Sequence, residues 1–127
     1  MPTILFEIKD NIAYITFNRP GKMNAINREM ALLFQEKLDH CQTDKSIRCV
    51  YISGVDKSFC AGQDLSEVIE PDGKSINKIL REQFNPIVWK IRTLEKPVVG
   101  AINGVAAGAG ANLALACDVV VASESAY

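Results

Sequence analysis

The sequence is poor in the residues on which several common kinds of site depend. It contains one histidine, His40, and four cysteines, none of which forms a Cys-x-x-Cys pair. Zinc sites need Cys and His ligands at short spacings, so we predict no metal site. Cys60 precedes a predicted helix start, but a cysteine nucleophile needs a histidine to activate it, and His40 falls on the polar face of another predicted helix. We therefore interpret the cysteines as buried, reduced thiols and His40 as a solvated side chain.

The sequence also lacks an excess of charge of either sign. Fourteen Lys and Arg residues face 15 Asp and Glu residues, which gives a formal net charge of −1. Binding to nucleic acid or to an anionic membrane needs a basic surface, so this balance argues against both kinds of partner. Hydrophobic residues make up 48% of the chain, which is typical of a globular domain and not of a disordered one.

Signals for secretion or membrane insertion are weak. The first residues lack the basic region and the long apolar stretch of a secretory signal. Residues 98–117 carry no charge and are long enough to cross a membrane. They contain four glycines and two asparagines but few large aliphatic residues, so a buried strand, a glycine turn and a buried helix explain them better. We therefore expect a cytoplasmic protein.

Short apolar runs predict several β-strands. The first two runs are short and apolar, the second with alternating residues, and a short polar turn separates them, which predicts an N-terminal β-hairpin. The later runs are rich in β-branched residues and read as buried strands of an α/β layer. The predicted strands cover residues 4–8, 12–17, 47–53, 98–102 and 119–122.

Between the strands, apolar residues recur at helical spacing. Asn27 is a suitable N-cap for the first helix. Pro86 is expected to kink or split a longer helix, and the polar segment 70–74 reads as a surface loop. The predicted helices cover residues 28–41, a short stretch after Asp64, residues 76–94 and residues 109–117.

Two segments rich in glycine and alanine each follow a predicted strand and lead into a predicted helix. They are residues 58–65, at the end of a predicted loop over 55–62, and residues 103–112. Small side chains allow a ligand to approach the backbone closely, and the first turn of a helix presents free N–H groups. Two such N–H groups directed at one oxygen form an oxyanion hole.

Taken alone, these two segments have other interpretations. Close packing of a strand against a helix also needs small residues, and without further evidence that interpretation is preferred. The second segment loosely resembles a dinucleotide-binding motif, but the spacing of Gly104, Gly108 and Gly110 differs from Gly-x-Gly-x-x-Gly, and no acid suited to bind a ribose follows.

Three spaced groups of residues make the pattern more specific. They are Asn18-Arg19-Pro20 with Asn24-Ala25, Phe59-Cys60-Ala61-Gly62-x-Asp64-Leu65, and Lys96-Pro97-Val98 with Asn103-Gly104 and Gly108-x-Gly110. Together they resemble the enoyl-CoA hydratase/isomerase (crotonase) family, and the match runs in order across the chain. It most closely resembles the phenylacetate-degradation branch, the epoxyphenylacetyl-CoA isomerases. The resemblance implies an α/β fold, a crotonase-like spiral of repeated ββα units.

The resemblance also implies roles for individual residues. Each of the two segments contains a glycine bend, the first at Gly62 and the second at Gly108. The residue after each bend would donate an oxyanion N–H group, which assigns Gln63 and Ala109. Two of the residues assigned to CoA have simpler interpretations, Lys22 as a solvated lysine and Asp64 as a helix cap. No cofactor is implied beyond the CoA of an acyl-CoA substrate. The residues assigned to substrate and CoA are Lys22, Met23, Ala25, Ala61, Gly62, Asp64, Leu65 and Gly108.

The sequence departs from the family pattern at one catalytic position. Hydratases of the family use two glutamates, and one of them corresponds to Asn112, which cannot act as a general base. In members of the family, the other carboxylate comes after a strand that corresponds to the one ending near Ala122 in this sequence. The resemblance therefore favours isomerisation by one acid, with an enoyl-CoA hydratase or a non-catalytic acyl-CoA-binding module as alternatives. We expect residues 1–127 to be the N-terminal part of one domain, inactive alone, without the helices that build a trimer or hexamer.

Three further acids lie near these segments. Glu67 and Glu70 follow the first glycine bend, and we interpret them as part of a solvated face. Asp118 lies between apolar neighbours at the start of a predicted strand, and we interpret it as a structural acid whose carboxylate accepts hydrogen bonds.

Overall fold

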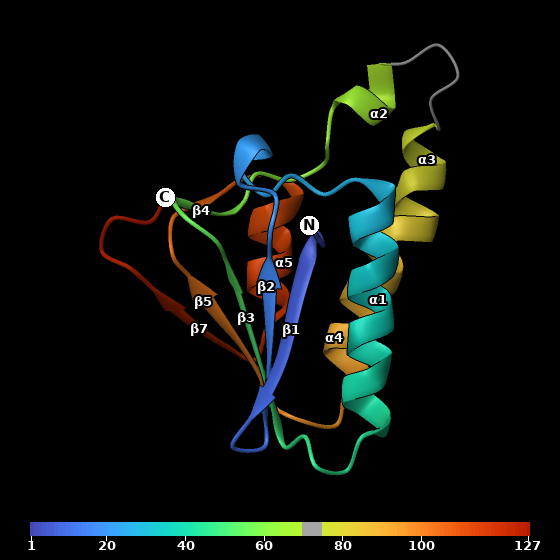
Figure 1. The fold of residues 1–127 in the computed structure, drawn as a ribbon. Coiled ribbons are helices and arrows are strands. Elements are labelled where there is room, and N and C mark those ends of the chain that lie inside the picture. The colour runs from blue at the N-terminus through green and yellow to red at the C-terminus, as the bar shows by residue number, and fades with distance from the viewer. Residues whose placement is uncertain (70–74) are drawn as a thin grey trace.

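The computed structural model describes residues 1–69 and 75–127, and its centre is a five-stranded sheet (Figure 1). The strand order is β1-β2-β3-β5-β7; β1 and β2 are antiparallel, and the other three neighbouring pairs are parallel. The strands are β1 (Ile4–Lys9), β2 (Ile12–Phe17), β3 (Cys49–Gly54), β5 (Val98–Ile102) and β7 (Val119–Ala122). All five predicted strands are confirmed, and so is the hairpin, whose turn residues Asp10 and Asn11 both have positive φ, as a type I′ turn requires.

The remaining two strands form a small separate sheet. β4 (Ser58–Cys60) and β6 (Val105–Ala106) pair in parallel. The prediction of a loop over 55–62 is therefore wrong at residues 58–60, and β6 was not predicted either. Both strands are too short for their sequences to show a period, so their pairing depends on the tertiary structure.

Helices cover one face of the large sheet. Phe17 of β2 contacts Phe34 of α1 (Arg28–Thr43) edge to face, with ring centroids 5.2 Å apart. Gly100 of β5 points to the same face, and a Cβ there would lie 3.0 Å from Cys117 Sγ at the end of α5 (Ala109–Ala116). α1 and α5 therefore bury the same side of the sheet, and Figure 1 shows α1 and α4 (Asn85–Thr93) next to each other.

The first helix begins as predicted. Asn27 Oδ1 accepts a hydrogen bond from Met30 N at 2.9 Å, which satisfies one of the free N–H groups of the first turn. Short helical segments complete the chain, and the predicted loop at 70–74 lies outside the described residues. These segments are a 3₁₀ turn at Pro20–Lys22, α2 (Ser66–Ile69), α3 (Ile76–Ile79) and a π-helical turn at Leu80–Phe84.

The predicted kink at Pro86 takes the form of that π-helical turn just before α4. Pro86 has no N–H group, so it cannot donate to the carbonyl of Glu82, four residues earlier. Gln35 of α1 supplies the missing donor, because its Nε2 donates to Glu82 O at 3.0 Å and to Gln83 O at 3.1 Å.

The segment 98–117 folds as the predicted strand, glycine turn and helix. Within residues 1–69 and 75–127, every helix is too short or too polar to traverse a lipid bilayer.

Candidate active site

The first glycine bend leaves the N–H group of Gln63 without an acceptor in the part of the chain that the structure describes. Ile26 forms a parallel bridge with Gln63: Ile26 N donates to Gly62 O at 2.7 Å, and Asp64 N donates to Ile26 O at 3.0 Å. In such a bridge the central residue's own N–H points away from the partner strand. Among the hydrogen bonds of the described residues, none uses Gln63 N as a donor.

The second glycine bend leaves a similar group on Ala109. Gly108 has φ 54° and ψ −124°, a conformation that favours glycine, and Ala109 is the first residue of α5. The next amides are used within the bend, since Gly110 N donates to Ala107 O at 2.9 Å and Asn112 N to Gly108 O at 3.2 Å. The N–H of Ala109 has no acceptor among the described residues, which is usual for the first turn of a helix.

The tertiary structure brings these two bends into contact. β4 pairs with β6, and Ala107 N donates to Cys60 O at 3.0 Å. A Cβ on Gly62 would lie 3.0 Å from Ala107 O and 3.4 Å from Ala109 N. The two N–H groups that the resemblance assigned to an oxyanion hole therefore come from adjacent stretches of backbone.

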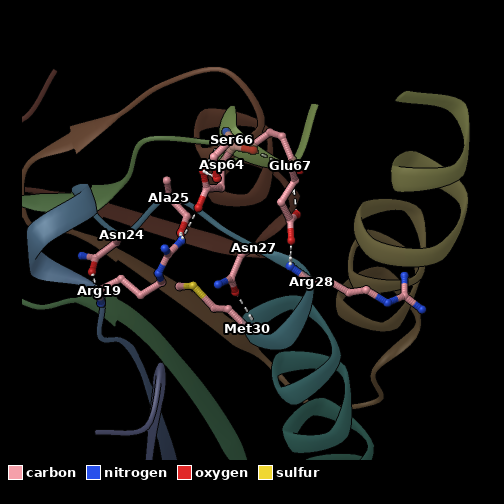
Figure 2. Close-up of polar contacts among 10 residues, drawn as sticks. Arg19, Asn24, Ala25, Asn27, Arg28, Met30, Asp64, Ser66 and Glu67 are labelled. Carbon is pink, nitrogen blue, oxygen red and sulfur yellow. Dashed lines mark hydrogen bonds and ion pairs between the residues drawn. The ribbon is translucent and has the colours of Figure 1, made fainter. Parts of the chain in front are cut away.

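A partly buried ion pair holds the first bend against the segment that precedes α1 (Figure 2). Arg19 Nη1 lies 3.1 Å from Asp64 Oδ2 and donates to Ala25 O at 2.6 Å. Asp64 Oδ1 also accepts a hydrogen bond from Ser66 N at 3.0 Å, as the helix-cap interpretation predicted. Burial raises the pKa of Asp64, but the hydrogen bonds from Ser66 and Arg19 outweigh it and hold the pKa below its ordinary value.

Asn24 fixes the same segment from the other side. It is fully buried; its Oδ1 accepts from Arg19 N at 2.8 Å, and its Nδ2 donates to Ser58 O at 2.9 Å. Ala61 N donates to Met23 O at 3.0 Å. The residues assigned to CoA on the two sides, Met23 and Ala25 with Ala61, Gly62 and Asp64, are thus brought together.

Glu67 differs from its sequence-based interpretation. It is half-buried, and its Oε2 accepts from Arg28 N at 2.8 Å (Figure 2). Its Oε1 accepts from Gln63 Nε2 at 3.1 Å. The prediction of a solvated face is therefore wrong for Glu67, because the fold brings it to the start of α1. Glu70 lies outside the described residues.

An apolar cavity of about 200 Å³ adjoins the two bends. Aliphatic and aromatic side chains of α2, α3 and the π-helical turn supply most of its wall. Gln63 and Ala109 lie at this cavity, and Leu65 is the one residue assigned to substrate or CoA that also lines it. The lining residues are Gln63, Leu65, Val68, Ile76, Ile79, Leu80, Phe84 and Ala109.

A second, larger hollow of about 590 Å³ lies beside the 3₁₀ turn. Its lining includes Met23 but not Lys22, which is exposed and makes no ion pair within the described part of the chain. Asp56 and Lys57 also line it, and sequence reasoning missed both. The available signal was their position just before the first glycine-containing segment.

Other candidate residues have structural roles. All four cysteines are free thiols, and burial raises the pKa of Cys60 to about 11, against a smaller lowering by a hydrogen bond from the Gly62 backbone. His40 is half exposed and lies 3.2 Å from Asp44 Oδ2. Asp118 Oδ2 accepts from Val98 N at 2.9 Å, as a structural acid should. The described residues contain no cluster of three or more His, Cys, Asp or Glu side chains suited to a metal ion.

The fold and the two adjoining bends first define a class, an α/β protein whose strand-end loops meet at a common backbone site. Comparison with known proteins then specifies the family, because the enoyl-CoA hydratase/isomerase family model matches residues 7–127. This chain belongs to the enoyl-CoA hydratase/isomerase family, as the resemblance predicted.

Individual relatives agree with that assignment. The chain is 40% identical over 129 residues to 1,2-epoxyphenylacetyl-CoA isomerase of Escherichia coli K12, covering 99% of this chain and 49% of the relative. It is 36% identical over 128 residues to 2,3-dehydroadipyl-CoA hydratase of the same organism, covering 99% and 48%. A solved enoyl-CoA hydratase/isomerase from Xanthobacter autotrophicus Py2 superposes with a TM-score of 0.91 at 30% identity, covering 98% and 47%. The chain thus spans about half the length of these relatives.

Proposed function

We propose that the protein binds an acyl-CoA thioester and stabilises its enolate with the N–H groups of Gln63 and Ala109. The observation that supports this most is the contact between the two glycine bends, in which neither N–H group has an acceptor among residues 1–69 and 75–127. Removal of an α-proton, or addition of a nucleophile at the β-carbon, places negative charge on the thioester oxygen. Two preorganised donors would stabilise that charge by about 3 kcal/mol each.

The surroundings of the bends suit the rest of such a substrate. The apolar cavity would take the acyl group, because its wall is almost entirely hydrocarbon. The CoA part would run along Lys22, Met23 and Ala25 and along the first bend, from Ala61 to Leu65. Gly108 of the second bend would also contact the substrate. No metal or further cofactor enters this proposal, since backbone amides supply the electrostatic stabilisation.

The reaction we favour is isomerisation of an enoyl-CoA or a related acyl-CoA, in the manner of the phenylacetate-degradation relatives. Asn112 is exposed and carries no titratable group, so a scheme with two carboxylates lacks one partner. We expect the proton-transferring carboxylate outside residues 1–127, together with the helices of a trimeric or hexameric assembly. Hydration remains the second candidate, because relatives at similar identity include a hydratase.

Ala109→Pro is a sharp test, because proline removes one N–H group with little strain. Ala109 is the first residue of α5, where proline is well tolerated. Gly108 at φ 54° and ψ −124° has the mirror image of the extended conformation that proline requires of the preceding residue, and glycine adopts it freely. Turnover of an enoyl-CoA by the full-length protein should fall by about 100-fold or more.

The matched control is Ala109→Ser, which keeps the N–H group and should retain turnover within about threefold. Circular dichroism would establish that both variants fold. Unchanged kcat in folded Ala109→Pro protein would contradict the proposal, and acyl-CoA binding without any turnover by the wild-type protein would favour a non-catalytic binding module.

A further inference from the structure

Glu67 connects the first proposed donor to the start of a long helix. Its Oε1 accepts from the side-chain Nε2 of Gln63 at 3.1 Å, and its Oε2 accepts from the backbone N–H of Arg28 at 2.8 Å. Both carboxylate oxygens are therefore used, each by a different element. The negative charge also lies at the N-terminal end of α1, where the helix dipole favours it.

The orientation of the Gln63 amide follows from this arrangement. Its Nε2 donates to Glu67 Oε1 and to Asp64 O, both at 3.1 Å, and both partners can only accept. A flipped amide would place an oxygen against two acceptors, so the nitrogen must occupy this position. The side-chain oxygen Oε1 is buried without a hydrogen-bond partner among the described residues, so the hydrogen bonds of this side chain there go to Glu67 and Asp64.

We infer that Glu67 is a positioning residue, which fixes the direction of the Gln63 N–H group by holding that residue's side chain to the N-terminus of α1; this rests on the proposed function. Among the described residues, the backbone of Gln63 is also held by the bridge to Ile26, in which Ile26 N donates to Gly62 O. Glu67 also belongs to α2. Val68 of the same helix and Leu65 just before it line the apolar cavity. The Glu67 carboxylate thus anchors both a proposed donor and part of the wall of the apolar cavity.

Glu67→Gln tests this in the full-length protein with little change of shape. An amide cannot accept at both ends, so its NH₂ group would face either the Arg28 N–H or the Gln63 NH₂ group, and one of the two hydrogen bonds would be lost. Misaligned donors weaken stabilisation of the transition state more than binding of the ground state. We expect kcat for an enoyl-CoA to fall by about 10-fold to 100-fold, with KM changed less than about threefold.

A spectroscopic measurement separates positioning from general stability. Cinnamoyl-CoA absorbs at longer wavelength when its carbonyl is polarised, so the wild-type protein should shift its absorption to the red, and Glu67→Gln should reduce that shift. The control is Glu82→Gln, which removes the carboxylate 2.8 Å from Arg28 Nη1 but leaves the Glu67–Gln63 contact in place. It should keep the wild-type shift and kcat.

A second pair of variants tests the link should Glu67→Gln fail to fold. Arg28 is the first residue of α1, and Asn27 before it is extended, so a proline at position 28 is compatible with the helix. Arg28→Pro deletes the N–H group that donates to Glu67. Arg28→Ala removes the same side chain but keeps the N–H. Lower kcat in Arg28→Pro than in Arg28→Ala supports the inference.

Equal kcat and equal red shift in Glu67→Gln and wild type, or equal kcat in the two Arg28 variants, overturn the inference while the proposed function stands. Absence of any red shift in the wild-type protein counts instead against the proposed function.

Discussion

A Cβ placed on Gly62 would lie 3.4 Å from the backbone nitrogen of Ala109. Gly62 lies in the loop after β4 and Ala109 begins α5 after β6, and the pairing of those two strands brings the residues together. Gly62 has φ 107°, a value that side-chain-bearing residues rarely adopt. A side chain at Gly62 would therefore be strained by its φ and would press on the backbone that carries the second proposed donor.

Gly62→Ala should accordingly damage the protein more than Gly108→Ala does. Both changes force alanine into positive φ, which costs about 1–2 kcal/mol of unfolding free energy. Only at Gly62 does the new methyl group also meet backbone, 3.0 Å from Ala107 O; at Gly108 nothing lies within 4 Å. Denaturant unfolding should therefore show a loss that is larger by about 1 kcal/mol for Gly62→Ala. Equal stability of the two variants would contradict this.

Asp64 should make stability depend on pH in the acid range. Its pKa in the folded protein lies below the ordinary value, so on acidification the unfolded state takes up the proton first. The contribution is fully present at neutral pH and is lost as the pH falls below about 4 and through the folded pKa.

Asp64→Asn tests that dependence. It should lower the unfolding free energy by about 1–2 kcal/mol at pH 7 and flatten the loss of stability below pH 4. Asp39→Asn is a suitable comparison, because the Asp39 side chain is 61% exposed in its pair with Lys90, and its loss should cost less than about 0.5 kcal/mol. Denaturation at pH 7 and at pH 3.5 measures both, and parallel pH profiles for Asp64→Asn and wild type would refute the assignment.

Gln35 should be important for the helix that contains Pro86, although it lies on a different helix. Its amide supplies the hydrogen bonds to Glu82 O and Gln83 O next to the proline. Gln35→Leu would leave these carbonyls without that donor and should cost about 1–2 kcal/mol. Urea unfolding measures the loss, and a variant as stable as wild type would show that water replaces the glutamine.

The thiols should differ sharply in reactivity. Burial raises the pKa of Cys41, Cys60 and Cys117 to about 11 each, so at pH 8 only roughly a thousandth of each is thiolate. Cys49 is the one half-buried thiol of the four. Ellman's reagent should label Cys49 first in native protein and the others only on unfolding. Fast labelling that persists in Cys49→Ser protein would contradict this order.

Much of the local structure could be predicted because it depends on residues close together in the chain. Alternating and helical apolar spacing located the five strands of the large sheet and the main helices, and the capping chemistry of Asn27 located the start of α1. Failures occurred where a segment is stabilised by distant partners. β4 and β6 are too short to show a period, and the π-helical turn before Pro86 depends on Gln35 of another helix.

The candidate site divides in the same way. The sequence by itself determined the family and the two glycine bends, because a backbone that must expose an N–H group needs glycine and alanine at particular positions. Only the tertiary structure decided that Gly62 and Ala109 adjoin, that Arg19 pairs with Asp64, and that Glu67 faces Gln63 and not solvent. Those contacts join residues far apart in the chain, and their geometry is set by how strands pair and helices pack.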